Sequence, residues 1–105
     1  GQVKEAMESL NTAIELNGDD GEAKHRRGQL KIELGDVASA VVDLVHAVTL
    51  MPKLAAAYND LGVALYENGD VKEAVDAFDK AVRLDPTDHQ ARENAAALRA
   101  YLAAK

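Results

Sequence analysis

Three histidines are the first candidates for chemistry, because a neutral imidazole can bind a metal or move a proton near neutral pH. His25, His46 and His89 lie far apart in the sequence. A helical zinc motif places two histidines four residues apart on one helix face, and no such pair occurs. We therefore predict no metal site and no cofactor, and we expect each histidine on the surface or in a groove.

A short acidic segment, Asn17-Gly18-Asp19-Asp20-Gly21, begins like a calcium-binding loop. That loop requires an acidic residue at its twelfth position, which here is Gly28. We therefore interpret the segment as a turn between helices. No glycine-rich phosphate loop follows a strand, and no serine or threonine has a plausible base nearby in the sequence. The pattern predicts that this chain is not an enzyme.

Composition excludes other classes of function. The 105 residues are enough for one small domain, and the net charge of −6 disfavours nucleic acid and anionic membranes as partners. The sequence has no cysteine, and its apolar runs are shorter than the roughly 20 residues of a membrane span. We predict no direct membrane insertion. The compartment stays open, with the cytoplasm as the default.

The elements that must position any functional side chain recur every 34 residues. Apolar residues follow a period of 3.6, as in Tyr58, Leu61 and Leu65, and Gly69-Asp70 can end one helix and begin the next. We expect helices over 2–16, 21–34, 37–50, 53–67, 70–84 and 89–104. The recurring sets include Gly1, Gly35 and Gly69; Val3, Val37 and Val71; Ala6, Ala40 and Ala74; and Ala13, Ala47 and Ala81. This period is typical of stacked repeats, which offer a long binding surface rather than a catalytic cleft.

Two glycines occupy the same position inside successive helices. Glycine inside a helix costs about 1 kcal/mol relative to alanine. A cost that recurs at Gly28 and Gly62 indicates a recurring purpose. We expect close approach of the partner helix, at Ala40 and Ala74.

Residues 55–88 resemble one tetratricopeptide repeat almost position for position. The pattern is carried by Tyr58, Leu61, Gly62, Leu65, Ala74, Phe78, Ala81 and Pro86. Residues 21–54 match through Gly28, Ala40, Leu44, Ala47 and Pro52. The resemblance implies an all-α fold of antiparallel helix hairpins stacked as a right-handed α-solenoid. Within one domain over 1–105, residues 1–20 would be the second helix of a repeat, 21–54 and 55–88 two repeats, and 89–105 a terminal covering helix.

The family resemblance also implies a function. The first helix of each repeat lines a concave groove that holds a peptide or another protein. Transferred position by position, the predicted partner-facing residues are Glu22, His25, Arg26, Gln29, Glu33, Asn59, Asp60, Val63, Tyr66, Glu67, Gln90, Glu93, Asn94 and Ala97. Tyr66 is the best candidate anchor, because aromatic residues dominate binding hot spots.

Some members of the family hold the terminal carboxylate of chaperone tails with a Lys-Asn-Asn-Lys-Arg clamp. The corresponding positions here are His25, Gln29, Asp60, Gln90 and Asn94. None of them matches the clamp, and Asp60 would repel a carboxylate. The sequence therefore predicts that this clamp is absent.

The helix expected over 21–34 departs from the family pattern. Lys24, Arg27 and Lys31 stand where the family has bulky apolar residues, and Arg26 adds to a basic cluster. Two interpretations remain open. The long stems could cover apolar neighbours while the charges reach water, or the cluster could bind an acidic partner segment.

Three functions compete. The chain could be an adaptor or scaffold that binds a peptide or protein, a structural element that assembles with copies of itself, or a docking part of a larger enzyme. The helix over 2–16 has no preceding helix in this chain, so we expect a stripe through Val3, Ala6, Leu10 and Ala13 to be partly exposed. We hypothesise that the sequence is a piece of a longer array. Two alternatives remain open for this stripe: it could pair with a second copy, or the chain could be a monomer whose first helix frays.

Overall fold

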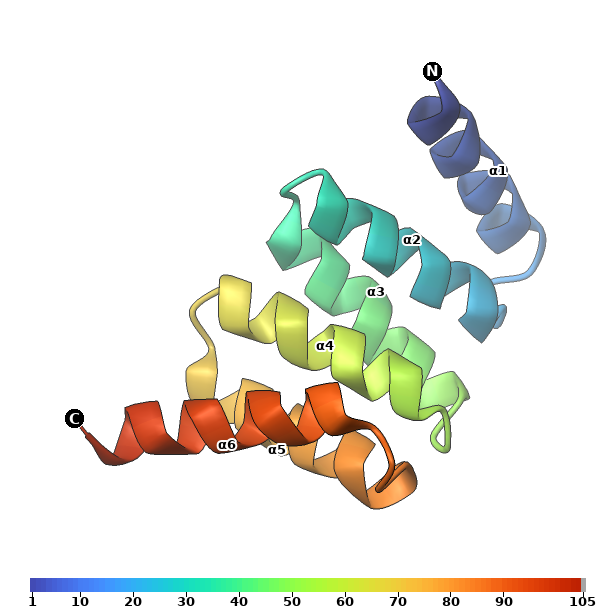
Figure 1. Ribbon diagram of the computed structural model, residues 1–105. Coiled ribbons are helices and arrows are strands. Elements are labelled where there is room, and N and C mark those ends of the chain that lie inside the picture. Colours follow the sequence, from blue (N-terminus) through green and yellow to red (C-terminus); the bar gives the residue numbers. More distant parts are fainter. Residues whose placement is uncertain (105) are drawn as a thin grey trace.

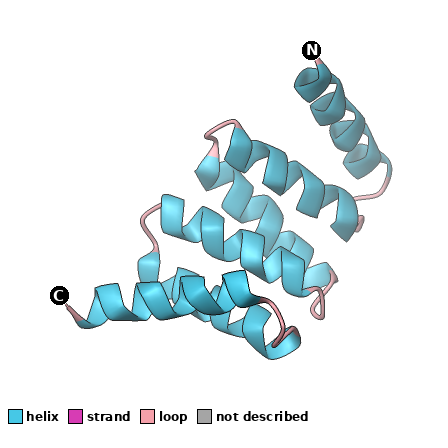
Figure 2. Cartoon of the chain, in the orientation of Figure 1, coloured by secondary structure: helices cyan, strands magenta, loops and turns pink. Residues whose placement is uncertain are grey.

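The computed structural model describes residues 1–104, and within that range the chain is all helical, with no strand (Figures 1 and 2). This confirms the predicted all-α repeat fold. Helix bounds differ from the predicted ones by one or two residues at most. The helices are α1 (Gln2–Leu16), α2 (Gly21–Glu33), α3 (Val37–Leu50), α4 (Ala55–Glu67), α5 (Val71–Leu84) and α6 (His89–Ala103).

The turns between helices follow from a few residues. Gly35 and Gly69 have φ values of 82° and 89°, the left-handed conformation that only glycine adopts readily. Asp20 and Asp88 cap the next helices, because their carboxylates accept hydrogen bonds from the Ala23 and Ala91 amides at 3.0 and 3.1 Å.

One predicted cap takes a different form. Asp70 stands at the N-cap of α5, but its side chain makes no capping hydrogen bond there. Its carboxylate instead accepts a hydrogen bond of 2.9 Å from the Asn68 amide nitrogen. Asp70 therefore begins α5 without a side-chain cap.

The helices stack in two layers. Helices α2, α4 and α6 lie toward the viewer in Figure 1, and α3 and α5 lie behind them. The core lies between the layers, where Ala40, Leu44 and Ala57 are fully buried. A second cluster joins Ala74 and Phe78 of α5 to Ala95 of α6. The layers leave the outward side of α2, α4 and α6 as one continuous face.

The two helical glycines do admit close packing, but the partners differ from the prediction. A Cβ atom on Gly62 would lie 2.7 Å from the Phe78 ring, and one on Gly28 would lie 2.6 Å from the Leu44 side chain. The expected partners were Ala74 and Ala40. A glycine leaves a gap on its helix, and a large knob from the facing helix fills it better than a small residue does.

Helix α1 stands at the edge of the stack and packs on α2 (Figure 1). It has no fully buried residue. Val3 is 44% exposed and Leu16 is 84% exposed. The expectation that part of the stripe on this helix is uncovered is therefore confirmed for Val3, whereas Leu10 and Ala13 are half-buried.

Candidate partner-binding site

A hydrogen-bonded link across α2 and α4 brings three of the predicted partner-facing residues together. Nε2 of His25 lies 2.7 Å from Oδ2 of Asp60. The Gln29 amide nitrogen donates to the same oxygen at 2.8 Å. His25 is buried rather than at the open surface, but it lines a hollow together with Arg26 and Gln29, as expected for a groove residue. The link fixes the spacing of the two helices and holds a carboxylate on their shared face.

An apolar pocket opens on the same layer, between α4 and α6. Its volume is about 240 Å³. Two of its lining residues, Phe78 and Leu98, were not predicted as site residues. Leu98 lies one helical turn beyond the predicted Asn94, so the helical spacing in the sequence could have identified it. The lining residues are Val63, Tyr66, Phe78, Asn94, Ala97 and Leu98. Tyr66 is 52% exposed and forms part of the wall.

The other predicted residues lie on the same three helices without forming one compact site. The guanidinium of Arg26 donates to Glu22 at 3.0 Å, and both side chains are exposed. The Gln90 amide donates to Asn94 at 3.1 Å. Glu33 lies apart from the α4–α6 pocket.

Glu33 lines a hollow of about 350 Å³ between α1 and α2, and Ala6 and Leu10 form part of its opposite wall. Glu67 and Glu93 are exposed on α4 and α6. Asn59 has a buried side-chain oxygen, and no described residue donates a hydrogen bond to it.

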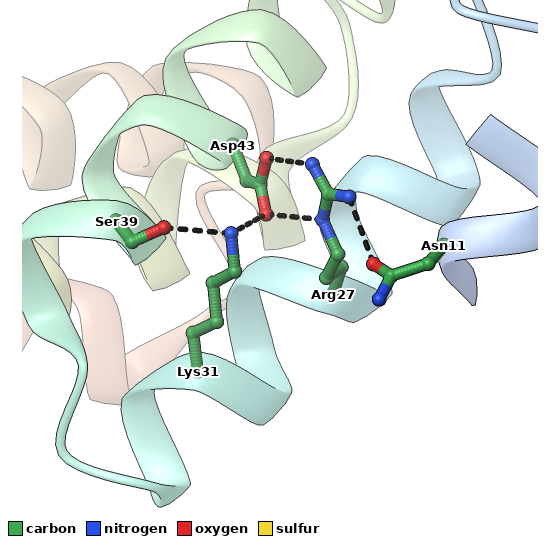
Figure 3. A network of polar contacts seen from close by, with 5 residues as sticks. All are labelled: Asn11, Arg27, Lys31, Ser39 and Asp43. Carbon is green, nitrogen blue, oxygen red and sulfur yellow. Dashed lines mark hydrogen bonds and ion pairs between the residues drawn. The ribbon is translucent and has the colours of Figure 1, made fainter. Parts of the chain in front are cut away.

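Two side chains of the basic cluster on α2 make contacts that neither interpretation of the sequence predicted. Figure 3 shows Arg27 and Lys31 reaching across to Asp43 of α3. Asp43 is 2% exposed, and Lys31 lies 2.9 Å from it. These contacts contradict both interpretations for Arg27 and Lys31, because their side chains are only 20% and 17% exposed and their charged groups bind Asp43 rather than being directed at water or a partner. They neutralise a buried acid that the sequence analysis did not single out.

Further hydrogen bonds complete this network. Arg27 also donates to Asn11 of α1 at 3.0 Å, and Lys31 donates to the Ser39 hydroxyl at 2.7 Å (Figure 3). Burial alone would raise the pKa of Asp43. The hydrogen bonds and charges of Arg27 and Lys31 outweigh burial, so the pKa of this carboxyl lies below its usual value. The hydrogen bond to Asp43 correspondingly raises the pKa of Arg27. Asp43 and Arg27 are therefore both charged near neutral pH, and the network joins α1, α2 and α3.

Metal-binding groups and membrane-spanning helices are two further features that bear on function. Over residues 1–104, no three His, Asp or Glu side chains lie close enough together to hold a metal ion. None of the helices described is long and apolar enough to cross a membrane. The arrangement on α2, α4 and α6 offers an apolar pocket, hydrogen-bonding amides and carboxylates, which are the groups that recognise a peptide.

Comparison with known sequences points to one family. Residues 55–88 match the family described as Tetratricopeptide repeat. The chain is 34% identical over 97 residues to the small glutamine-rich tetratricopeptide repeat-containing protein 2 of Mycosarcoma maydis, an overlap of 92% of this chain and 28% of that protein. The chain thus spans less than a third of the length of the curated relatives it matches.

Solved structures agree with the sequence comparison. The tetratricopeptide domain of Arabidopsis OM64 superposes with a TM-score of 0.88 at 30% identity, over 93% of this chain and 81% of that one. The first such domain of Spaghetti (RPAP3), bound to the HSP90 peptide SRMEEVD, gives a TM-score of 0.92 at 21% identity, over 98% and 82%. At 21% identity, the similarity to the Spaghetti domain shows the fold alone. Together with the 34-residue period and the paired helices, these comparisons show that the chain belongs to the tetratricopeptide repeat family.

Proposed function

We propose that this chain is a non-catalytic protein-interaction module that binds a peptide or protein segment on the face formed by α2, α4 and α6, as an adaptor or scaffold. The observation that carries the proposal is the apolar pocket between α4 and α6, because it opens on the layer predicted to face a partner. Its walls include four of the predicted residues: Val63, Tyr66, Asn94 and Ala97.

The rigidity of this face supports the proposal. The contacts of His25 and Gln29 with Asp60 hold α2 against α4, and Phe78 packs into the gap at Gly62 to hold α4 against α5. A face that is already ordered loses little conformational entropy on binding, and this favours affinity. The Spaghetti domain, which has the same fold, was solved with a bound peptide.

A displayed library of random peptides tests the proposed function without assuming a partner. The native chain is immobilised and panned, and each enriched peptide is then tested against a variant that carries Tyr66→Ala and Arg26→Ala. Both side chains are exposed, so the variant is expected to fold. Asp76→Ala on the exposed side of α5 is the matched control. We expect enriched peptides that bind the native chain and the control and lose affinity for the face variant. Failure to enrich any peptide that distinguishes them would contradict the proposal.

The carboxylate clamp of some family members is not part of this proposal. Asp60 places a negative charge at one of the clamp positions, and its Oδ2 already accepts two hydrogen bonds. A peptide carboxylate there would meet a like charge rather than a lysine or asparagine. We therefore expect no binding of an EEVD tail that depends on its free carboxylate.

A second candidate function is assembly with copies of the same chain through α1. The observation that favours it is the exposure of Val3 beside the hollow between α1 and α2. Ala6 and Leu10 line that hollow, so a second copy would find apolar surface there. This assembly would cover Arg26, Gln29 and Glu33 of α2, which also line the hollow, and would leave the pocket between α4 and α6 free.

A further inference from the structure

The pocket between α4 and α6 has the size and chemistry of a subsite for one apolar side chain. Sites for drug-sized ligands measure roughly 300–1,000 Å³, and this pocket, at about 240 Å³, is smaller. Phe78 and Leu98 are apolar, Val63 and Ala97 flank them, and the Asn94 amide is its one strongly polar lining group. Burial of a leucine-sized side chain in such a site removes apolar surface from water and favours binding.

Carboxylates lie on both helices that flank this pocket. Asp60 and Glu67 lie on α4 three residues before and four residues after Val63, on the side of the helix that carries the pocket wall. Glu93 lies on α6, four residues before Ala97. Glu67 and Glu93 are exposed and open to a ligand. The side chain of Asp60 is 24% exposed, although its Oδ2 already contacts His25 and Gln29 of α2.

The nearby cations are engaged with other groups. Arg26, the one cation among the predicted partner-facing residues, is paired with Glu22. Arg99 of α6 makes an ion pair with Asp79 of α5, in the other layer. Arg92 of α6 reaches the Pro86 carbonyl oxygen, at the limit of a hydrogen bond. The face therefore presents an apolar pocket with Glu67 on one flanking helix and Glu93 on the other. Neither of these carboxylates forms an ion pair among the described residues, whereas Asp60 lies 2.7 Å from Nε2 of His25.

From this arrangement, and resting on the proposed function, we propose that the partner is a basic peptide segment with a single apolar anchor side chain. The anchor fills the pocket between α4 and α6, while Lys or Arg residues on either side of it face Asp60, Glu67 and Glu93. Charge complementarity selects this occupant over an acidic segment, because like charges brought together across an interface are repelled. The apolar anchor gives affinity, and the carboxylates give selectivity and a fast, salt-dependent encounter.

The test uses labelled synthetic peptides and fluorescence anisotropy. The basic probe has the sequence Ala-Lys-Lys-Leu-Lys-Lys-Ala with both ends blocked. A second peptide replaces Leu with Ser, and a third replaces every Lys with Glu. We expect the second peptide to bind about ten-fold more weakly, since loss of a buried anchor costs on the order of 1.4 kcal/mol. We expect no measurable binding of the third, and weaker binding of the basic probe as salt is raised.

Protein variants test the apolar pocket and the flanking carboxylates separately. Ala97→Leu extends a side chain from the rim into the pocket and is expected to weaken the basic probe about ten-fold while leaving the melting temperature unchanged, because Ala97 is exposed. Glu67→Gln with Glu93→Gln is expected to weaken the probe and to flatten its salt dependence. Asp76→Asn, an exposed carboxylate on α5, is the control and is expected to change neither property.

Each outcome of these experiments distinguishes the inference from the proposed function. Tighter binding of the Glu-containing peptide, or equal binding of the Leu and Ser peptides, would overturn the basic and anchored partner. If library panning still enriches peptides that need Tyr66, the proposed function stands in either case. If the basic probe binds equally well to the Ala97→Leu variant, the pocket is not its anchor site and the inference is wrong.

Discussion

Arg27 and Asp43 form a two-point ion pair between α2 and α3, in which Nε of Arg27 lies 2.7 Å from Oδ2 and Nη2 lies 2.7 Å from Oδ1. The residues 34 positions later are Leu61 and Ala77, which are both buried in the core between the layers. Two successive repeats therefore solve the same packing problem differently, one with charges and one with apolar side chains. The apolar residues of the second repeat can therefore be placed in the first repeat, to measure what the charged network contributes to stability.

Removal of the acid alone should destabilise the fold. Asp43→Ala leaves Arg27 and Lys31, whose side chains are 20% and 17% exposed, without their buried counter-charge. Breaking a buried pair on one side costs about 3–5 kcal/mol. We expect about 3 kcal/mol here, because both cations can turn partly toward water. Urea unfolding followed by circular dichroism measures the change. Asp76→Ala on α5 is the control and should stay within about 0.5 kcal/mol of the native chain.

Replacement of the whole network by its apolar counterpart should recover the loss. The triple variant carries Arg27→Leu, Lys31→Leu and Asp43→Ala, which are the residues at Leu61, Leu65 and Ala77. Replacing a buried ion pair by well-packed apolar residues is often neutral or stabilising by about 1–4 kcal/mol. We expect the triple variant to be at least as stable as the native chain in the same urea experiment. A triple variant no more stable than Asp43→Ala would show that apolar packing cannot substitute here.

The network also makes stability depend on pH in a defined direction. The pKa of Asp43 is lower in the folded chain than its usual value. Its contribution is therefore fully present above the ordinary aspartate pKa of about 3.9 and is lost as pH falls through the folded value. The raised pKa of Arg27 keeps that partner charged over the whole range.

We expect the stability of the native chain, relative to the triple variant, to stay constant from neutral pH to about pH 5 and to fall as the pH drops below the ordinary aspartate pKa of about 3.9. Urea unfolding of both proteins at several pH values measures this difference, and the other carboxylates cancel because both chains contain them. A relative stability that is constant or rises on acidification below the ordinary aspartate pKa would contradict the ion-pair assignment.

The glycine inside α4 should be intolerant of even a methyl group. Gly62→Ala places a Cβ against the Phe78 ring, which is 2% exposed and enclosed. Overpacking costs about 1–3 kcal/mol, and the better helix propensity of alanine returns about 1 kcal/mol. We expect a net loss of stability in thermal unfolding.

A smaller side chain in place of Phe78 should reduce the loss of stability caused by Gly62→Ala. Phe78→Leu shortens the side chain that enters the gap at Gly62, so Gly62→Ala should cost less in its presence than alone. A double-mutant cycle measures the coupling. Additive effects of the two substitutions would mean that the helices do not meet at this glycine.

The fold could be predicted from the sequence because recognisable residues mark where helices begin and end. Gly35 and Gly69 mark turns that need positive φ, and the 34-residue period fixes which helices are equivalent. The identity of the close contacts could not be predicted in the same way. We expected small residues opposite Gly28 and Gly62, but the rotation of the facing helix decides whether an alanine or a large side chain meets the gap, and periodicity does not determine that rotation to within one residue.

The polar contacts were harder to predict than the helices. Arg27 and Lys31 stand at positions where the family has apolar residues, and Asp43 is the one acidic residue of α3, which has no Lys or Arg. Their pairing therefore left a signal in the sequence. The contact of His25 with Asp60 left none, because it joins residues 35 positions apart and depends on side-chain rotamers. The pocket was partly predictable, since Tyr66, Val63 and Asn94 share a face, but the contributions of Phe78 and Leu98 depend on how α5 and α6 pack.

Self-association through α1 is tested by sedimentation velocity over a wide range of concentration. Val3→Glu places a charge on the exposed stripe and should abolish any association of the native chain, since burying an unpaired charge is costly. Thr12→Glu, at an exposed position of the same helix, is the control and should leave association unchanged. A native chain that is monomeric at high concentration, or whose association survives Val3→Glu, would exclude pairing through this stripe.

The most direct test of the central claim, that α2, α4 and α6 form the partner-binding face, is chemical-shift mapping of the ¹⁵N-labelled chain during titration with a peptide enriched by library panning. The account predicts that the largest shifts fall on amides of α4 and α6 around Val63, Tyr66 and Asn94, with smaller shifts near Asp60. Largest shifts on the outward sides of α3 and α5, around Val42 and Asp76, would place the binding surface on the opposite layer and contradict the account.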